Sequence, residues 1–199
     1  GWNDVLPYFL KSENNELGKS EFHNDSGPIM VSNKKINLKM LDEFQNAAEE
    51  CGIQKTKDFN TGDNSGIGFF QFTTNHNKSL LKLRCSAAKG YLNPIKNRTN
   101  LKIVTNAHVQ KINFEGKKAV SVSYYQGEKV ITTKTKREII LSAGSIGSPH
   151  ILQVSGIGDA NKIKKNGIDV IHESKGVGQN LQDHLMFRPV YNCLLYTSP

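Results

Sequence analysis

The residues with the clearest chemistry come directly after segment 137–141, which ends in an apolar run. Because the apolar residues of this run are continuous, they predict a strand that is buried on both faces, as in a parallel sheet. Small residues follow at 142–145, where they let another group approach the backbone closely. A ligand that contacts main-chain atoms could therefore bind at this turn.

A short helix is expected directly after the turn. Ser148 is a suitable N-cap and Pro149 a suitable first residue for a helix over 150–154, which Gly156 would end. A strand, a tight turn and a helix N-terminus together favour a phosphate-bearing ligand, because free N–H groups and the helix dipole attract anions. The same pattern also fits an ordinary connection between a strand and a helix, and the residue types leave both interpretations open.

Other segments of the chain must position this turn. Apolar spacing predicts helices over 2–13, 38–51 and 84–92, the last ending before Pro94, and short strands over 29–31, 69–73 and 101–104. Three alternating segments separated by glycine-containing turns predict an antiparallel meander of strands over 109–114, 119–125 and 130–134. Polar loops occupy 14–28 and 58–68.

Composition excludes several classes of protein. The chain has 199 residues and 37% hydrophobic content, which suits one globular domain or parts of two. It contains no apolar run long enough for a transmembrane segment. The net charge is +8, but the lysines are scattered singly and in pairs, which favours a solvated surface over a nucleic-acid site. The three cysteines have no spacing typical of a metal site or disulfide framework.

Four segments in the same order resemble one family. Residues 144–158, Gly-Ser-Ile-Gly-Ser-Pro-His-Ile-Leu-Gln-Val-Ser-Gly-Ile-Gly, are similar to the second signature of the glucose–methanol–choline (GMC) flavin oxidoreductases. The segment 176–184, Gly-Val-Gly-Gln-Asn-Leu-Gln-Asp-His, resembles a further family landmark, as do 2–13 and 91–101. The resemblance covers about residues 1–192.

The resemblance implies a mixed α/β fold: an incomplete, Rossmann-like FAD-binding domain with a β-meander, plus the start of a substrate-binding domain. Residues 1–94 would be a helical and loop segment between the two domains, and 95–175 part of the FAD-binding domain. Residues 176–192 would enter the substrate-binding domain. The last seven residues, 193–199, resemble a translated sequencing adapter and are excluded from the fold.

The resemblance also assigns site residues. The backbone of Val109 would hold the adenine edge of FAD, and Ala143 and Gly144 would approach the cofactor. Asp183 and His184 would lie near the substrate, where a structural hydrogen-bonded pair at the domain junction is favoured over a role in acid–base chemistry. The catalytic His and its His or Asn partner would lie beyond residue 192, so no catalytic or metal-binding residue is expected within the chain.

The implied reaction is oxidation of an alcohol by hydride transfer to the flavin, with an electron acceptor and a compartment that the sequence does not identify. In choline-oxidising members a Glu commonly stands two residues after the Asp-His pair, where Met186 stands here. Methionine carries no charge for a quaternary ammonium, so this position favours a neutral primary alcohol. The alternative is a non-catalytic binding or structural protein that retains the GMC fold.

Overall fold

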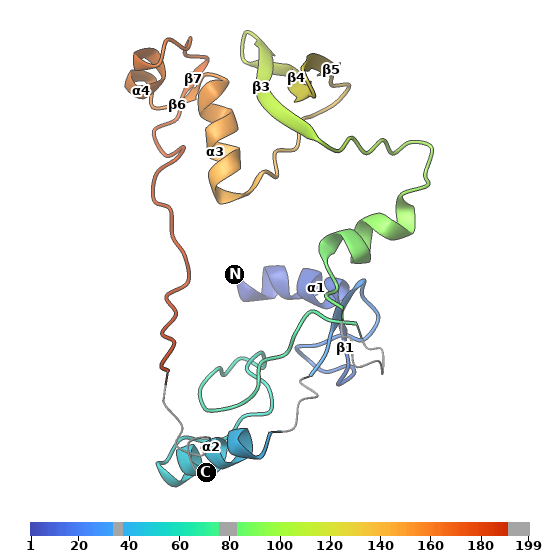
Figure 1. The fold of residues 1–199 in the computed structure, drawn as a ribbon, viewed down its shortest axis with the longest axis vertical. Coiled ribbons are helices and arrows are strands. Elements are labelled where there is room, and N and C mark those ends of the chain that lie inside the picture. Colours follow the sequence, from blue (N-terminus) through green and yellow to red (C-terminus); the bar gives the residue numbers. More distant parts are fainter. Residues whose placement is uncertain (34–37, 76–82, 191–199) are drawn as a thin grey trace, which may run out of the picture. The chain divides into compact units, whose positions relative to one another are not determined.

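The computed structural model describes residues 1–33, 38–75 and 83–190. The chain divides into two compact units, Gly1–Ile103 and Val104–Pro199, each of which has its own local structure. Figure 1 shows the elements of both units along the chain. The predicted adapter segment, 193–199, lies outside the described residues.

The first unit begins with the predicted N-terminal helix, which the structure confirms as α1 (Trp2–Ser12). The next residues form a short strand, β1 (Glu13–Asn15), where the sequence predicted the helix end and a loop. This strand pairs in parallel with β2 (Ile29–Val31), which lies at the predicted position. The second predicted helix is also present, as α2 (Lys39–Glu50), and Gly52 follows it with a φ of +85°.

The remaining elements of the first unit differ from expectation. Residues 69–73 form no strand; Phe72 makes a single bridge to Ser32. The helix predicted to end before Pro94 instead consists of a π-helical turn, η1 (Ala88–Leu92), followed by a 3-10 turn, η2 (Asn93–Ile95). Pro94 is accommodated because the first turn of a helix does not need its missing N–H. The predicted strand over 101–104 is irregular chain.

The second unit contains the predicted meander. Strands β3 (Ala107–Glu115), β4 (Lys118–Gln126) and β5 (Lys129–Lys134) form an antiparallel sheet in sequence order. Two-residue connections join the strands, and each contains a glycine with positive φ, Gly116 and Gly127. These turns match the right-handed twist of the strands, which explains why the sequence pattern was sufficient to predict them.

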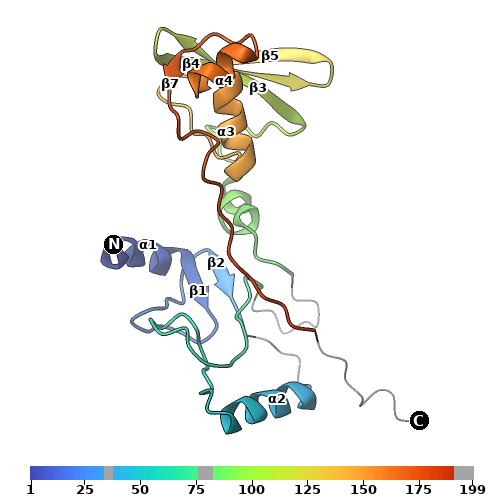
Figure 2. The ribbon, with the colours of Figure 1, turned by 90° about the vertical axis from the view of Figure 1, so that its left-hand side faces the viewer.

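Helix α3 (Gly144–Val154) packs against β3 (Figure 2). A buried serine joins the two elements: Ser155 Oγ accepts a hydrogen bond from the Ile112 N–H at 2.9 Å and donates to the Ile151 carbonyl. Beyond α3 the chain forms three short elements that the sequence did not predict. They are β6 (Ile157–Gly158), α4 (Ala160–Lys165) and β7 (His172–Glu173), with β6 and β7 paired in parallel.

The start of α3 corrects the predicted helix boundary. Ser148 is not the N-cap, and Pro149 lies inside the helix rather than at its first position. The helix begins five residues earlier than predicted, at Gly144, with Ala143 as the N-cap. Ser148 Oγ instead reaches back to accept a hydrogen bond from the Ala143 N–H at 3.0 Å. The side-chain oxygen therefore satisfies a backbone donor near the helix start from within the helix.

The predicted buried strand over 137–141 is wrong for the described structure. These residues form no strand, and the Ile140 side chain is 79% exposed. A strand forms only where a neighbouring strand takes up its backbone hydrogen bonds. No described strand lies beside this segment, so its backbone has no ladder partner there, and Ile140 is exposed although Ile139 and Leu141 are half-buried.

The turn after α3 generates a stability prediction. Gly156 has a φ of +88°, and a Cβ placed there would lie 2.4 Å from the Asp169 carbonyl oxygen. Gly127 has a φ of +62° but no atom within 4 Å of such a Cβ. We expect Gly127→Ala to cost about 1 kcal/mol through backbone strain alone. We expect Gly156→Ala to cost at least about 2 kcal/mol more, because the backbone of Asp169 must also move.

Urea unfolding of the intact protein measures the free energies of unfolding of both variants. Equal losses of stability in Gly156→Ala and Gly127→Ala would contradict the close approach between the two backbone segments.

Candidate functional site

The turn before α3 is open, as the sequence analysis required. Ala143 and Gly144 are both exposed. Gly144 has a φ of +81°, and no atom lies within 4 Å of a Cβ placed there. The first turn of α3 carries no acidic residue. A ligand could therefore reach these main-chain atoms, and the positive end of the helix dipole would favour an anionic one.

Val109 lies on β3, whose other edge is not paired with any described strand. In an antiparallel pair, backbone groups alternate between pointing toward the partner strand and pointing away from it. Ile112 lies opposite Val122, and its N–H points away from β4 because it bonds to Ser155. The direction of the Ile112 N–H therefore shows which residues of β3 point their backbone groups away from β4.

The register then gives the orientation of Val109. Val109 lies opposite Tyr124, which is two residues from Val122 on β4. A bulge between Val109 and Lys111 places an extra residue on β3, so the pairing with β4 continues on both sides of it. Residues two apart on β4 have backbone groups with the same direction. The N–H and C=O of Val109 therefore face the free edge of β3. A backbone donor and acceptor at such an edge can pair with a heteroaromatic ring.

The two segments predicted to bind the cofactor belong to the same unit, in which α3 packs on β3 and Ser155 joins them. The cavities found in this unit border other residues. One of about 610 Å³ lies between α3 and α4 and includes His150, Gln153 and Lys162. Another of about 420 Å³ lies between β3 and residues 167–171. Ala143 and Gly144 are exposed and Val109 is half-buried, and none of the three lines these two cavities.

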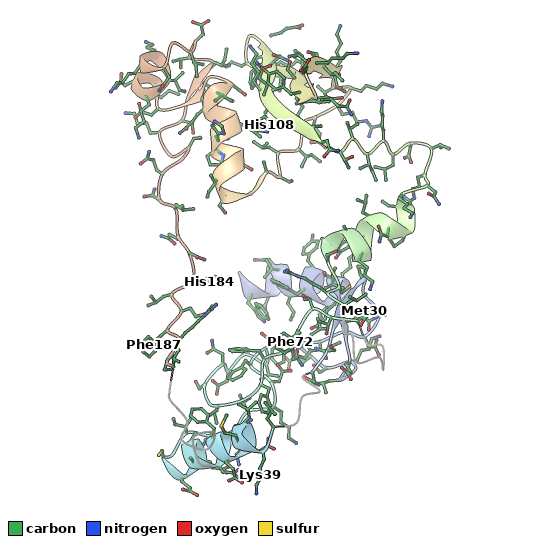
Figure 3. The ribbon with its side chains drawn as sticks, in the orientation of Figure 1. Met30, Lys39, Phe72, His108, His184 and Phe187 are labelled. Atoms are coloured by element: carbon green, nitrogen blue, oxygen red, sulfur yellow. The ribbon has the colours of Figure 1, made fainter. Side chains whose placement is uncertain are left out.

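The three substrate-proximal candidates lie on an extended, exposed stretch after β7, where Figure 3 labels His184 and Phe187. The Asp183 carboxylate accepts a hydrogen bond from the backbone N–H of His184 at 2.8 Å, so this contact does not orient the imidazole. Met186 is 63% exposed, and its sulfur lies 3.0 Å from Nε of Arg188. This geometry favours the structural role for Asp183, and it brings a cation beside Met186.

Other kinds of site receive no support from the described part of the chain. Within it, no group of three His, Cys, Asp or Glu residues is arranged to hold a metal ion. Cys51 is exposed and Cys85 is buried, and neither forms a disulfide. No helix among the residues that the structure describes is long and apolar enough to span a membrane. The pKa of Asp63 is lowered by the backbone N–H and the hydroxyl of Ser65, in an exposed loop turn.

Sequence analysis missed a buried charged cluster in the first unit. His23 is 6% exposed and lies between two carboxylates that come from other segments. Its Nδ1 lies 2.9 Å from Oε2 of Glu13, and its Nε2 lies 2.8 Å from Oδ2 of Asp58. The side chains of Glu13 and Asp58 are 18% and 12% exposed. The imidazole therefore lies between two largely buried carboxylates.

A buried amide extends this cluster. Asn15 is 2% exposed, and its Nδ2 lies within 3.1 Å of both Glu13 Oε1 and His23 Nδ1. The same Nδ2 donates to Oε1 of Gln71 at 3.4 Å. No sequence signal joined these residues, because the contacts connect positions up to 56 residues apart. Only the polar composition of the loops around His23 and Asp58 suggested that this part of the unit is not an apolar core.

Known structures include a close match to this fold. An FAD-dependent oxidoreductase from Chaetomium thermophilum is similar over 92% of this chain and 33% of its own, with a TM-score of 0.84 and 34% identity. The match confirms the mixed α/β architecture that the sequence analysis predicted. The fold of this chain is therefore that of about a third of a protein in the class of FAD-dependent oxidoreductases.

Sequence comparison identifies the family. The family model for GMC oxidoreductases matches residues 1–186, and the chain belongs to that family. The chain is 40% identical over 191 residues to the oxygen-dependent choline dehydrogenase of Pectobacterium atrosepticum and 41% identical over 187 residues to the mitochondrial choline dehydrogenase of Homo sapiens. These matches cover 96% and 93% of the chain, which spans about a third of each relative, 34% and 31%.

The cluster around His23 generates a prediction. His23→Leu should lower the free energy of unfolding by about 3–5 kcal/mol, because the buried carboxylates of Glu13 and Asp58 would lose the imidazole that lies between them. Adding Glu13→Gln and Asp58→Asn to this variant should recover at least half of the loss, since no uncompensated charge then remains buried. His172→Leu, at an exposed position, is the matched control and should change stability little.

Urea unfolding of the four proteins measures these effects. The account fails if the triple variant is as unstable as His23→Leu.

Proposed function

We propose that this chain is part of an FAD-dependent oxidoreductase that oxidises the CH–OH group of an alcohol by hydride transfer to the flavin. The observation that carries the proposal is the family match over residues 1–186, together with 40% identity to a choline dehydrogenase over 96% of the chain. The proposed role of these residues is to bind and orient the cofactor and to begin the substrate-binding region.

The exposed backbone of the second unit fits FAD. The N–H and C=O of Val109 face a free strand edge and suit the hydrogen-bonding edge of an adenine. Ala143 and Gly144 leave the backbone accessible at the start of α3, where the dipole favours an anionic or electron-rich part of the cofactor. When bound, FAD supplies the hydride acceptor. The chain's own residues hold the cofactor and expose its reactive face.

The roles that we propose for the parts of the chain follow the domain boundaries predicted from the sequence. Residues 95–175 would form part of the FAD-binding domain, which contains β3, β4, β5 and α3. Residues 1–94 would lie between the two domains, and 176–192 would lead into the substrate-binding domain. We place no catalytic base among the described residues; the resemblance places it beyond residue 192.

The substrate we propose is a neutral primary alcohol. Met186 provides no negative charge, and Arg188 Nε lies 3.0 Å from its sulfur, so a quaternary ammonium at this position would face a cation. A flexible methionine can instead pack against an aliphatic or aromatic group. The relatives named choline dehydrogenase make choline the direct competitor to test.

The function is tested by expressing the full reading frame that contains this chain. We expect a yellow protein whose flavin absorbance bleaches when an alcohol is added without an electron acceptor. A folded protein that binds no flavin, or whose flavin no alcohol reduces, would instead support the non-catalytic alternative.

The backbone role of Val109 leads to a specific prediction. Val109→Pro removes the N–H that faces the free edge, which an edge strand tolerates, and should weaken FAD binding about tenfold. Val109→Ala keeps the backbone groups and should bind FAD nearly as the wild type does. Flavin retention after dialysis measures both variants, and circular dichroism confirms the fold. Equal retention in the two variants would exclude a backbone contact at Val109.

Met186 leads to a prediction about specificity. Met186→Glu should raise kcat/KM for choline, relative to its neutral analogue 3,3-dimethylbutan-1-ol, by about tenfold through attraction of the ammonium. Met186→Gln is the matched neutral control and should leave this ratio near the wild-type value. The wild type should prefer the neutral alcohol. A strong wild-type preference for choline, or a ratio that Met186→Glu leaves unchanged, would contradict the proposed role of Met186.

A further inference from the structure

One glutamine on α3 holds the chain just before the extended stretch of residues 179–190. Gln153 lies in the last turn of α3, and its Nε2 donates a hydrogen bond to the carbonyl oxygen of Val177 at 3.2 Å. The N–H of Val177 in turn donates to the carbonyl of Ser174 at 3.1 Å, which closes a turn after β7. The side-chain bond therefore joins the end of α3 to the turn from which the stretch begins.

Two glycines leave the space that this side chain occupies. A Cβ at Gly158, on β6, would lie 3.2 Å from Cγ of Gln153, and a Cβ at Gly178 would lie 2.6 Å from its Nε2. The methylene groups of Gln153 thus pass close to Gly158, and its amide lies against Gly178. A side chain at Gly178 would displace the amide from Val177, so the local sequence leaves this one contact open.

The chain changes direction at the same place. Gly178 and Asn180 both have left-handed backbone conformations, with φ values of +75° and +54°. Residues 181–190 then form an exposed stretch, which Figure 1 shows as an extended ribbon after β7. Within the described part of the chain, residues 180–190 make hydrogen bonds only among themselves. Gln153 therefore supplies the nearest side-chain contact that fixes where this stretch begins.

We propose that Gln153 is a positioning residue for the substrate end of the reaction. By holding the Val177 carbonyl it fixes the point from which residues 179–190 extend, and with it the position of Asp183, His184 and Met186. The inference rests on the proposed function, because it takes these three residues to lie near the alcohol. Gln153 acts through Val177 and is not a catalytic residue. A stretch that is positioned in advance reduces the entropy lost when the substrate binds.

Two substitutions remove the contact in different ways. Gln153→Met keeps the approximate length of the side chain but removes the donor. Gln153→Glu keeps its shape but places a carboxylate against the Val177 carbonyl, so that two acceptors face each other. Gln126→Met, at an exposed position on β4, is the matched control. All variants are made in the full reading frame that contains this chain.

Hydrogen–deuterium exchange tests the contact without any flavin chemistry. The backbone N–H groups of Ser174, Val177 and Gln179 are hydrogen-bonded to carbonyl groups, so their exchange reports opening of this turn. We expect residues 174–179 to exchange at least about fivefold faster in Gln153→Met and Gln153→Glu than in the wild type. The Gln126→Met control should exchange like the wild type.

Steady-state kinetics separate a positioning role from a merely structural one. With 3,3-dimethylbutan-1-ol as the substrate, Gln153→Met should raise KM about fivefold and change kcat less than about twofold. A residue that only stabilises the fold would instead lower Tm and flavin retention and leave the KM of the folded enzyme unchanged. Circular dichroism shows that each variant is folded.

Gly178→Ala gives an independent test of the same contact. Its Cβ would displace the Gln153 amide, so this variant should raise KM as Gln153→Met does. Gly167→Ala is the matched control, because Gly167 has a similar φ of +71° and no atom lies within 4 Å of a Cβ placed there. In a Gln153→Ala background, Gly178→Ala should change KM less than about twofold, since no amide remains to be displaced.

The outcomes distinguish this inference from the proposed function. Unchanged exchange over residues 174–179 in both Gln153 variants would overturn the inference, as would an unchanged KM in both or an equal rise of KM in Gly167→Ala. A wild-type flavin that no alcohol reduces would overturn the proposed function and the substrate role of Gln153 together. The exchange measurement would then still decide whether Gln153 holds this turn.

Discussion

The pairing of backbone N–H and C=O groups is the constraint on which this structure depends. The meander satisfies it locally, because each strand is joined to its partner by a two-residue turn. Where one edge of a strand has no partner strand, a side chain can take up a backbone hydrogen bond instead, as Ser155 Oγ does for the Ile112 N–H. Val109 occupies the same kind of edge position, and its free backbone groups are what make the cofactor proposal physically reasonable.

The same constraint separates the parts of the fold that sequence predicts from those that it does not. Helices α1 and α2 and the meander depend on local spacing and turns, so their patterns were sufficient. The apolar segment 137–141 has the composition of a buried strand but no described neighbour, and it remains irregular. The start of α3 was misplaced for a different reason: Ser148 caps the Ala143 N–H from inside the helix, a role that the Ser-Pro pair does not reveal.

The candidate sites divide in a similar way. Ala143 and Gly144 were predicted from the family resemblance and from the small residues of the turn, and the structure leaves both exposed, which is compatible with the prediction but does not test it. The cluster around His23 could not, because its members come from a strand and two loops that only folding brings together. Composition described those loops as polar, yet they contain the most buried charged groups of the first unit. The hydrogen bond between the amides of Asn15 and Gln71 joins residues that are 56 positions apart, so local spacing could not predict it.

Apolar burial contributes little to either unit. Buried hydrophobic side chains among the described residues are Cys85, Ile112, Ile151 and Ile163, while most aromatic rings are exposed. Polar interactions such as the Ser155 bridge and the His23 cluster therefore hold much of the local structure. A hydrogen bond contributes a net of about 1 kcal/mol, so exposed apolar surface of this extent is stabilised far more by burial against further protein than by additional polar contacts.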